Sequence, residues 1–239
     1  MAIYTVTLAG KKQVAEGTFE FLLSKPEGFK YRAGQFFDIL LEPVANAPKS
    51  SYVHGFSFAS APFEPNLAAA TRMRDTAFKN AIRNLPDGTE VKIDACFGSF
   101  TLPKQTDTPV AFLIGGIGIT PVRSMIAQAS HDQSAQAITL LYANKTPDLA
   151  AFTQDLRAYS QHNTHFTFVP VYTDPGQQVD GAESGVIDAA MIRRHVTRIP
   201  DTLFYLSGPA GMVRAMRAIL MDELHVDEDN IRTEEFDGY

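Results

Sequence analysis

In the first hundred residues, apolar and polar positions alternate in short runs, which is the pattern of half-buried β-strands. The runs are rich in β-branched and aromatic residues, and glycine, proline or asparagine separates them. The pattern predicts one helix, over residues 77–85, between the last two of these runs. It predicts strands over residues 3–8, 18–24, 35–41, 53–59, 67–73 and 90–95. Six short strands at this spacing indicate a small antiparallel β-barrel.

Beyond residue 106, apolar strands alternate with amphipathic helices. The predicted strands cover residues 110–114, 137–142, 166–172 and 203–207, and the predicted helices cover residues 121–129, 149–161, 189–196 and 211–224. Such alternation indicates a doubly wound parallel sheet, whose ligands bind at the carboxyl ends of the strands. A polar segment over residues 102–109 separates the two patterns. We therefore predict two domains, a six-stranded antiparallel β-barrel over residues 1–105 and an α/β domain over residues 106–239.

The run over residues 112–121, Phe-Leu-Ile-Gly-Gly-Ile-Gly-Ile-Thr-Pro, joins a buried strand to a helix through three glycines. Without Cβ atoms, this turn brings free backbone N–H groups close to a ligand at the sheet edge, as a pyrophosphate site requires. The turn is neither a P-loop nor a G-x-G-x-x-G fingerprint. A tight turn with no ligand would show the same glycines, so the choice between a phosphate-binding and a purely structural turn depends on the other motifs of the chain.

Composition excludes several classes of partner and metal site. The 239 residues carry a net charge of −6, whereas nucleic-acid binding needs an excess of Lys and Arg. Cys96 is the only cysteine, so neither an internal disulfide nor an iron–sulfur centre is expected. His162 and His165 have no third ligand nearby in the sequence, and we predict no metal site.

The longest apolar run, over residues 110–119, is much shorter than the roughly 20 residues that cross a bilayer. The first residues alternate like a strand and lack the basic and apolar regions of a signal peptide. We therefore expect a cytoplasmic protein with no membrane contact.

Three motifs together resemble those of the ferredoxin reductase family of flavoproteins. Residues 54–60, His-Gly-Phe-Ser-Phe-Ala-Ser, resemble its Arg-x-Tyr-Ser-x-x-Ser box, and residues 115–121 match its nicotinamide loop. Residues 207–212, Ser-Gly-Pro-Ala-Gly-Met, resemble its Cys-Gly-Pro-x-x-Met turn. The order and separation of the motifs agree, and the resemblance covers essentially the whole chain. It implies a flavin-binding barrel, an NAD(P)H-binding domain, FAD in preference to FMN, and NADH or NADPH as electron donor.

On the barrel side, the resemblance places Phe56 flat against the isoalloxazine ring and Ser57 near its N5 atom. In an ordinary barrel strand the same two residues would simply belong to the core. His54 stands where the family has Arg, a charged bidentate phosphate ligand. Binding of the FAD pyrophosphate is therefore expected to be weaker, and FMN stays an alternative cofactor.

The resemblance also lays the flavin tail along residues 71–73 and the first turn of the following helix. Lys79 there adds a positive charge where the family has a hydroxyl, and one of Arg72 and Arg74 is expected to be only solvated. The flavin-binding residues expected in the barrel are His54, Gly55, Phe56, Ser57, Thr71, Arg72, Met73, Ala77, Phe78 and Lys79.

In the second domain, Ser207 replaces the family's Cys near the nicotinamide C4, which puts the rate in question more than the type of reaction. Lys145 and Asp174 follow the second and third strands, a poor clamp for a 2′-phosphate, so NADH is favoured over NADPH. The nucleotide-binding residues expected here are Gly115, Gly116, Gly118, Thr120, Pro121, Asn144, Lys145, Ser207, Gly208, Pro209 and Met212.

The last residues include two aromatics, Phe236 and Tyr239. Many family members end in an aromatic that covers the flavin face where the nicotinamide enters, and either residue could supply it here. The alternative is a frayed chain end. Together with Ser57 and Ser207, these aromatics are the catalytic residues that the resemblance implies.

The expected function is transfer of hydride from NAD(P)H to bound FAD, with electrons passed to a separate acceptor such as a ferredoxin, a flavodoxin or a small oxidant. One alternative is a flavin- and nucleotide-binding regulatory subunit that senses redox state without turnover of its own. Another is a flavin reductase that uses flavin as a substrate.

Overall fold

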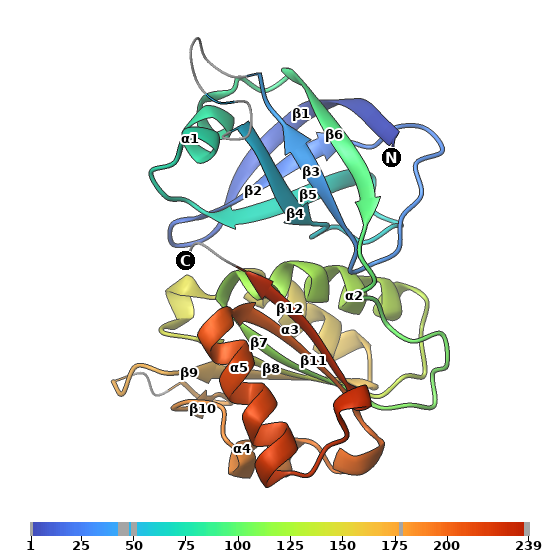
Figure 1. Ribbon diagram of the computed structural model, residues 1–239, viewed down its shortest axis with the longest axis vertical. Coiled ribbons are helices and arrows are strands. Elements are labelled where there is room, and N and C mark those ends of the chain that lie inside the picture. Colours follow the sequence, from blue (N-terminus) through green and yellow to red (C-terminus); the bar gives the residue numbers. More distant parts are fainter. Residues whose placement is uncertain (1, 43–47, 49–51, 177–178, 237–239) are drawn as a thin grey trace.

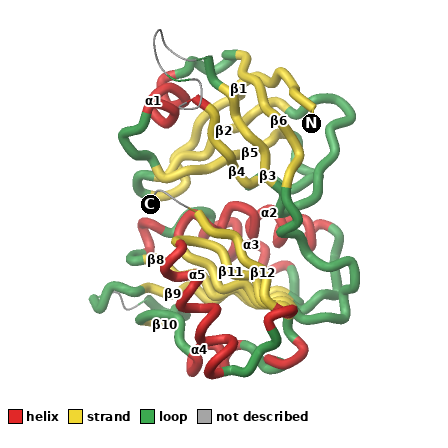
Figure 2. Tube along the Cα trace, in the orientation of Figure 1, coloured by secondary structure: helices red, strands yellow, loops and turns green. Residues whose placement is uncertain are grey.

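The structure is a computed structural model that describes residues 2–42, 48, 52–176 and 179–236. Antiparallel strands fill the upper half of Figure 1, and a parallel sheet with helices on both faces fills the lower half. Figure 2 shows helices α2 and α3 between the two sheets. The whole arrangement confirms the predicted fold class.

Among the described residues, the N-terminal sheet has six antiparallel strands in the order β4-β3-β6-β1-β2-β5. The end strands of this order approach each other where the Ala59 N–H donates to the Ala68 carbonyl at 2.8 Å. Side chains that alternate along the strands fill the interior, with Phe21, Phe37 and Phe58 fully buried. The strands are β1 (Ala2–Ala15), β2 (Thr18–Ser24), β3 (Phe36–Leu40), β4 (Val53–Ser57), β5 (Asn66–Arg72) and β6 (Glu90–Phe97).

Strand β1 runs well past the predicted end at residue 8, because its second half pairs with β2 as a hairpin. Lys11, Lys12 and Gln13 on this half obscure the apolar alternation in the sequence. Helix α1 (Ala77–Asn84) lies where it was predicted. It begins after Thr76, whose Oγ1 accepts the Lys79 N–H at 3.3 Å, so this N-cap satisfies one free donor of the first turn.

The C-terminal sheet of the described chain has parallel strands in the order β10-β9-β8-β7-β11-β12. Its strands are β7 (Val110–Gly115), β8 (Ile138–Asn144), β9 (Phe166–Tyr172), β10 (Glu183–Ser184), β11 (Leu203–Pro209) and β12 (Ile231–Phe236). Its α-helices are α2 (Ile119–His131), α3 (Thr153–His162), α4 (Ala189–His195) and α5 (Ala210–Ala218).

Side-chain alternation along β7 explains why helices cover both faces of this sheet. Phe112 and Ile114 pack with helices α2 and α3 in one core, whereas Ala111 and Leu113 pack with helices α4 and α5 in another. Because both faces are covered, every residue of β7 is buried.

Two helices differ most from their predicted bounds, and two strands were not predicted. Helix α3 begins at Thr153 rather than at 149, because a 3₁₀ turn over Pro147–Leu149 and the left-handed backbone of Phe152 (φ 60°) precede it. The helix predicted to residue 224 is α-helical only to Ala218 and continues as a π-helix over Ile219–Glu223. The sequence pattern missed β10 and β12.

The two sheets share one hydrophobic core. Ala59, Ala68 and Ala70 of the barrel belong to the same buried cluster as Ile117 and Met125 of the α/β unit. The small barrel side chains allow close approach of the turn that follows β7. The predicted flavin-strand and glycine-turn segments therefore lie on facing surfaces.

Candidate active site

The glycine turn after β7 and the residues that end β11 fit together because three positions have no side chain. A Cβ on Gly118 would lie 2.5 Å from the Ser207 carbonyl carbon and oxygen. A Cβ on Gly208, which has a φ of 147°, would lie 2.8 Å from the Gly115 carbonyl oxygen. Met212 covers Gly115 so closely that a Cβ there would lie 2.3 Å from its sulfur. The structure thus brings together the second and third sequence motifs.

Two hydroxyl groups hold the turn itself. Gly116–Gly118 forms one 3₁₀ turn that leads directly into α2. The Tyr142 hydroxyl donates to the Gly116 carbonyl at 3.0 Å, and the Thr120 hydroxyl donates to the Ile117 carbonyl at 3.1 Å. Pro121 lies in the first turn of α2, where its missing N–H costs nothing.

Three buried polar atoms without a hydrogen-bond partner lie at this same edge. Within the described part of the chain, the buried side-chain atoms that lack a partner include Asn144 Nδ2, Ser207 Oγ and Glu234 Oε2. These residues lie near the carboxyl ends of β8, β11 and β12, and β7 with its glycine turn separates β8 from β11. Since buried polar groups are normally satisfied, such a cluster indicates a polar ligand.

Glu234 is a residue that the sequence reasoning missed. It is the strand partner of Ser207 in the β11–β12 register, and burial raises its pKa to about 7. The carboxyl group therefore titrates near neutrality, directly beside the predicted nicotinamide site. The sequence over residues 231–236 carries no clear strand pattern, and only the pairing with β11 identifies the segment as a strand.

Phe236 is the last described residue, and Tyr239 lies outside the described residues. Phe236 pairs with Pro209 in the β11–β12 register, so the strand carries it next to the Ser207 loop. The residues up to 236 are therefore ordered sheet rather than a frayed end.

On the barrel side, Phe56 is largely enclosed by other aromatic rings. It is 4% exposed, with the His54 ring stacked at 4.7 Å and the Phe78 ring tilted at 5.6 Å. An isoalloxazine ring can lie on Phe56 only if one of these neighbours moves. Ser57, the next residue, is also 4% exposed.

His54 does not replace the charge of the family's Arg. Partial burial lowers its pKa, and Lys79 lowers it further, while the hydrogen bond to the Gly55 carbonyl partly opposes this, so the neutral ring is favoured at pH 7. Its Nδ1 lies 2.8 Å from the Gly55 carbonyl oxygen.

Lys79 is buried and bonds the end of a barrel strand. It is 6% exposed, and its Nζ donates to the Arg72 carbonyl at 2.8 Å. Burial lowers its pKa, and Arg74 lowers it further. Lys79 thus anchors the end of β5, whose Thr71 is buried and whose neighbour Met73 is half-buried; Ala77, at the start of α1, is exposed.

Of the two arginines, Arg74 is exposed and Arg72 is half-buried. Arg72 and Thr18 line a cavity of about 60 Å³ together with Gly116 and Pro209. Arg72 of the barrel and Gly116 of the glycine turn therefore line the same small cavity.

The loops after β8 and β9 are joined by two backbone hydrogen bonds. The Thr173 N–H donates to the Asn144 carbonyl at 2.9 Å, and the Asp174 N–H donates to the Lys145 carbonyl at 3.1 Å. The backbone of Asp174 therefore lies next to that of the exposed Lys145.

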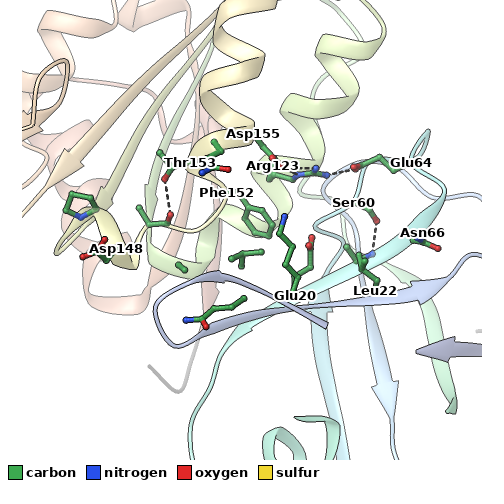
Figure 3. A pocket seen from close by; sticks show the side chains of 18 of the residues that line it. Glu20, Leu22, Ser60, Glu64, Asn66, Arg123, Asp148, Phe152, Thr153 and Asp155 are labelled. Carbon is green, nitrogen blue, oxygen red and sulfur yellow. Dashed lines mark hydrogen bonds and ion pairs between the residues drawn. The ribbon is translucent and has the colours of Figure 1, made fainter. Parts of the chain in front are cut away.

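A cavity of about 690 Å³ lies between the barrel and helices α2 and α3 (Figure 3). Its lining includes Glu20, Glu64, Arg123 and Asp155. Burial raises the pKa of Glu20, which Arg123 and Lys12 partly oppose. The sequence reasoning missed this region, although Arg123 stands out as a charge within an apolar stretch of α2.

Comparison with known proteins agrees with the geometry. The model of the oxidoreductase NAD-binding domain family matches residues 112–218. The crystal structure of the flavohem-like FAD/NAD binding domain of nitric oxide dioxygenase from Vibrio cholerae superposes with a TM-score of 0.84 at 21% identity, covering 97% of this chain and 98% of that one. A ferredoxin NADP+ reductase from Neisseria gonorrhoeae, with bound FAD and NADP, superposes with a TM-score of 0.81 at 21% identity, covering 98% of each chain. Residues 112–218 thus match the oxidoreductase NAD-binding domain family, and nearly the whole chain shares the fold of these two solved structures.

Curated proteins are also similar to part of this chain. One component of the Na(+)-translocating NADH-quinone reductase of Serratia proteamaculans is 30% identical over 162 residues, which is 66% of this chain and 39% of that protein. The chain thus matches less than half the length of the first curated relatives, between 36% and 39%. No helix in the described ranges is both long and apolar enough to cross a membrane.

Proposed function

We propose that the protein is an NAD(P)H-dependent flavoprotein reductase that passes hydride from the nucleotide to bound FAD and electrons on to a separate acceptor. The observation that carries this proposal is the cluster of unpaired Asn144, Ser207 and Glu234 atoms around the glycine turn. Each of these groups lacks a partner that a nicotinamide nucleotide would supply. Ser207 and Glu234 are strand partners, so two of these groups lie side by side at the end of one strand pair.

The residues present fit a dinucleotide between the two sheets. The glycine turn leads into the start of α2, where the helix dipole favours negative charge, and its half-buried Gly116 lines a small cavity together with Arg72 of the barrel. These groups would hold a pyrophosphate. When bound, the flavin supplies hydride and electron-transfer chemistry.

On the nucleotide side, the Ser207 hydroxyl would orient the nicotinamide from the end of β11. The Glu234 carboxyl beside it would donate a hydrogen bond when neutral and accept one when ionised. Because the pKa of Glu234 is about 7, both protonation states are available at neutral pH. Phe236 would exclude water from the same place. These roles position the donor and keep the transfer site dry.

NADH is the proposed donor. Asp174 lies beside Lys145, so a 2′-phosphate would meet a carboxylate as well as the only cation of these two loops in the described chain. Steady-state kcat/KM values for NADH and NADPH test this preference, and a higher value for NADPH would contradict it.

The acceptor is proposed by chemical class. A relative is named a terephthalate 1,2-dioxygenase reductase component, 23% identical over 81% of this chain and 56% of that protein. By analogy we propose a separate redox protein, such as a ferredoxin or flavodoxin, or a small oxidant as the acceptor here.

A second candidate function is favoured by the enclosure of Phe56 and the neutrality of His54. Both features weaken retention of a flavin, which suits a flavin reductase that binds flavin as a substrate. The two candidates differ in colour, because only a protein with resident FAD purifies yellow.

The deciding experiment combines a visible spectrum of the purified protein, identification of any extracted flavin by mass, and anaerobic addition of NADH. Bleaching of the bound flavin supports the reductase. A colourless protein that reduces added flavin supports the second candidate. A yellow protein that NADH does not bleach would contradict both and would indicate a redox-sensing protein without turnover.

A further inference from the structure

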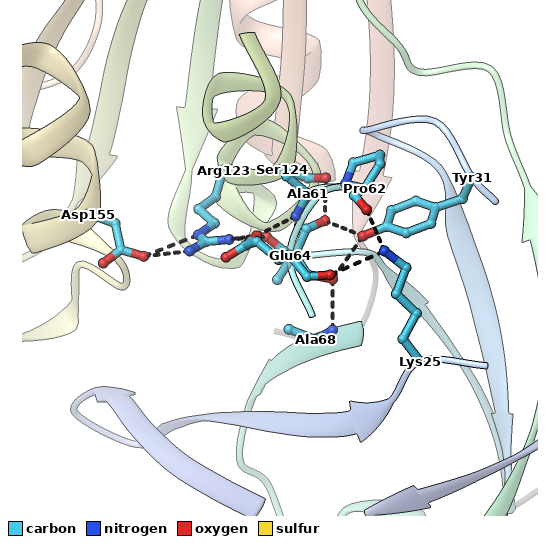
Figure 4. A network of polar contacts seen from close by, with 11 residues as sticks. Lys25, Tyr31, Ala61, Pro62, Glu64, Ala68, Arg123, Ser124 and Asp155 are labelled. Carbon is cyan, nitrogen blue, oxygen red and sulfur yellow. Dashed lines mark hydrogen bonds and ion pairs between the residues drawn. The ribbon is translucent and has the colours of Figure 1, made fainter. Parts of the chain in front are cut away.

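One polar contact region joins the α/β unit to the barrel, and we call it the clasp. It consists of Arg123 and Ser124 of α2, Asp155 of α3, and residues 59–64 of the barrel (Figure 4). Arg123 donates through Nη1 to the Ala59 carbonyl at 3.1 Å and to the Glu64 carboxylate. It donates through Nε and Nη2 to Asp155 Oδ2, at 3.2 Å and 2.8 Å. One guanidinium therefore holds both domains at once.

Ser124 adds a second link one residue along the helix. Its hydroxyl donates to the Ser60 carbonyl at 2.5 Å. The Ser60 hydroxyl in turn accepts the Ala68 N–H at 2.9 Å, and the Tyr31 hydroxyl lies 3.0 Å from it. The Ser60 hydroxyl thus links residues 59–64 to Ala68 of strand β5, so a displacement of this segment would also displace β5.

The position of the clasp in the chain gives it a role beyond domain cohesion. Ala59 follows Ser57, the predicted neighbour of flavin N5, by two residues. Arg123 and Ser124 follow Thr120 of the nicotinamide turn by three and four residues, so all three lie on the same face of α2. The clasp therefore contacts each of the two segments within four residues of the position predicted to lie beside the flavin or the nicotinamide.

We propose that Arg123 is a positioning residue that sets the alignment of the nicotinamide turn with the flavin strand, acting through Ala59 and Glu64. This inference rests on the proposed reductase function, because it assigns Arg123 a part in that reaction. Hydride transfer depends steeply on the distance between donor and acceptor, so a small displacement of α2 against the barrel costs rate rather than binding.

The chemistry of Arg explains why this residue suits the position. Its planar fork presents donors in several fixed directions, and here they bond a carbonyl and a carboxylate of the β4–β5 connection and a carboxylate of α3. A Lys has one compact ammonium group and cannot hold all three at these angles. Arg123 is 8% exposed, so water does not easily replace a lost partner.

The first test measures hydride transfer in single-turnover, anaerobic reduction of the bound flavin by NADH. In Arg123→Met, the limiting rate constant should fall at least about tenfold, while flavin content and the NADH dissociation constant stay within about twofold. Arg123→Lys should recover part of the rate. The isotope effect measured with NADH deuterated at C4 should become more temperature-dependent in Arg123→Met, because the donor–acceptor distance is then less tightly held.

The second test does not depend on activity. Hydrogen–deuterium exchange of the purified protein without nucleotide should accelerate in both residues 57–64 and residues 115–124 of Arg123→Met. The matched control is Arg198→Met, which breaks the exposed pair between Arg198 and Asp201 inside the α/β unit and should change neither the exchange nor the rate. If Arg123→Met does not fold, Glu64→Gln and Arg123→Lys carry both tests.

The outcomes separate this inference from the proposed function. If NADH fails to reduce the wild-type flavin, the reductase function is wrong. The hydrogen–deuterium exchange of residues 57–64 and 115–124 then still tests whether the clasp couples the two segments. If wild type is reduced and Arg123→Met loses thermal stability with an unchanged limiting rate and isotope effect, the positioning role is overturned.

Discussion

At the scale of single residues, Glu234 combines burial, an unpaired oxygen and a pKa near neutrality at the end of β12. A carboxyl whose pKa is raised in the folded state is protonated in both states at low pH and costs no stability there. As the pH rises from the usual value of 4.5 to about 7, only the unfolded state ionises, so folding stability falls over this range. A shift of this size corresponds to roughly 3 kcal/mol at most.

Glu234→Gln should therefore be more stable than wild type above pH 7 and equally stable near pH 4.5. Chemical denaturation at several pH values measures the difference. The same substitution should remove an apparent pKa near 7 from the pH profile of kcat/KM. A difference in stability that does not depend on pH would show that the carboxyl group titrates normally.

Phe56 gives a second prediction for a single residue. Phe56→Leu should loosen flavin by on the order of 1 kcal/mol or more, because it removes an aromatic face beside His54 and Phe78. The matched control is Phe37→Leu, since Phe37 is the strand partner of Phe56 on β3 and is fully buried. Both variants should lose stability, but only Phe56→Leu should release flavin in equilibrium dialysis. If both variants retain flavin equally, the flavin does not lie against Phe56.

At the scale of elements, the glycine turn and the end of β11 depend on close backbone approach. Gly118→Ala would bring a methyl group within 2.5 Å of the Ser207 carbonyl, so one of the two loops must move. We expect a loss of stability of about 1–3 kcal/mol and a larger NADH dissociation constant. Denaturant titration and fluorescence titration with NADH measure the two effects.

The control for this prediction is Gly211→Ala in the first turn of α5, where an added Cβ meets no atom within 4 Å. Because Ala favours a helix over Gly, this variant should gain up to about 1 kcal/mol. Equal behaviour of the two variants would show that the loops are not in close contact.

The elements also show how far the sequence alone leads. Strands such as β2 and β9 were predicted at their observed bounds, because their apolar residues are bounded by clear turn signals. Strand β12 was missed, since Arg232, Glu234 and Glu235 make it polar, and only pairing with β11 explains it. Likewise, no local pattern foretells that His54 would cover Phe56 or that Lys79 would turn toward the Arg72 carbonyl. Such contacts depend on side chains brought together by the fold.

At the scale of the whole molecule, the predicted boundary near residue 105 stays a prediction. The clasp and the shared core suggest that the two sheets unfold together, although each has its own interior. A single calorimetric transition is the expected result for wild type. Two transitions would show that the sheets are energetically independent.

The Arg123 and Glu64 pair makes this cooperativity measurable by a double-mutant cycle. Arg123→Met leaves Glu64 and Asp155 without their shared cation, and because both carboxylates keep some contact with water, we expect a loss of about 1–3 kcal/mol. Glu64→Gln in the Arg123→Met background should cost much less than Glu64→Gln alone, since the partner has already gone. Denaturant unfolding of the four proteins gives the coupling energy. A coupling energy of zero would mean that the ion pair between the sheets contributes nothing to their cohesion, and that the shared apolar core alone holds the barrel against α2.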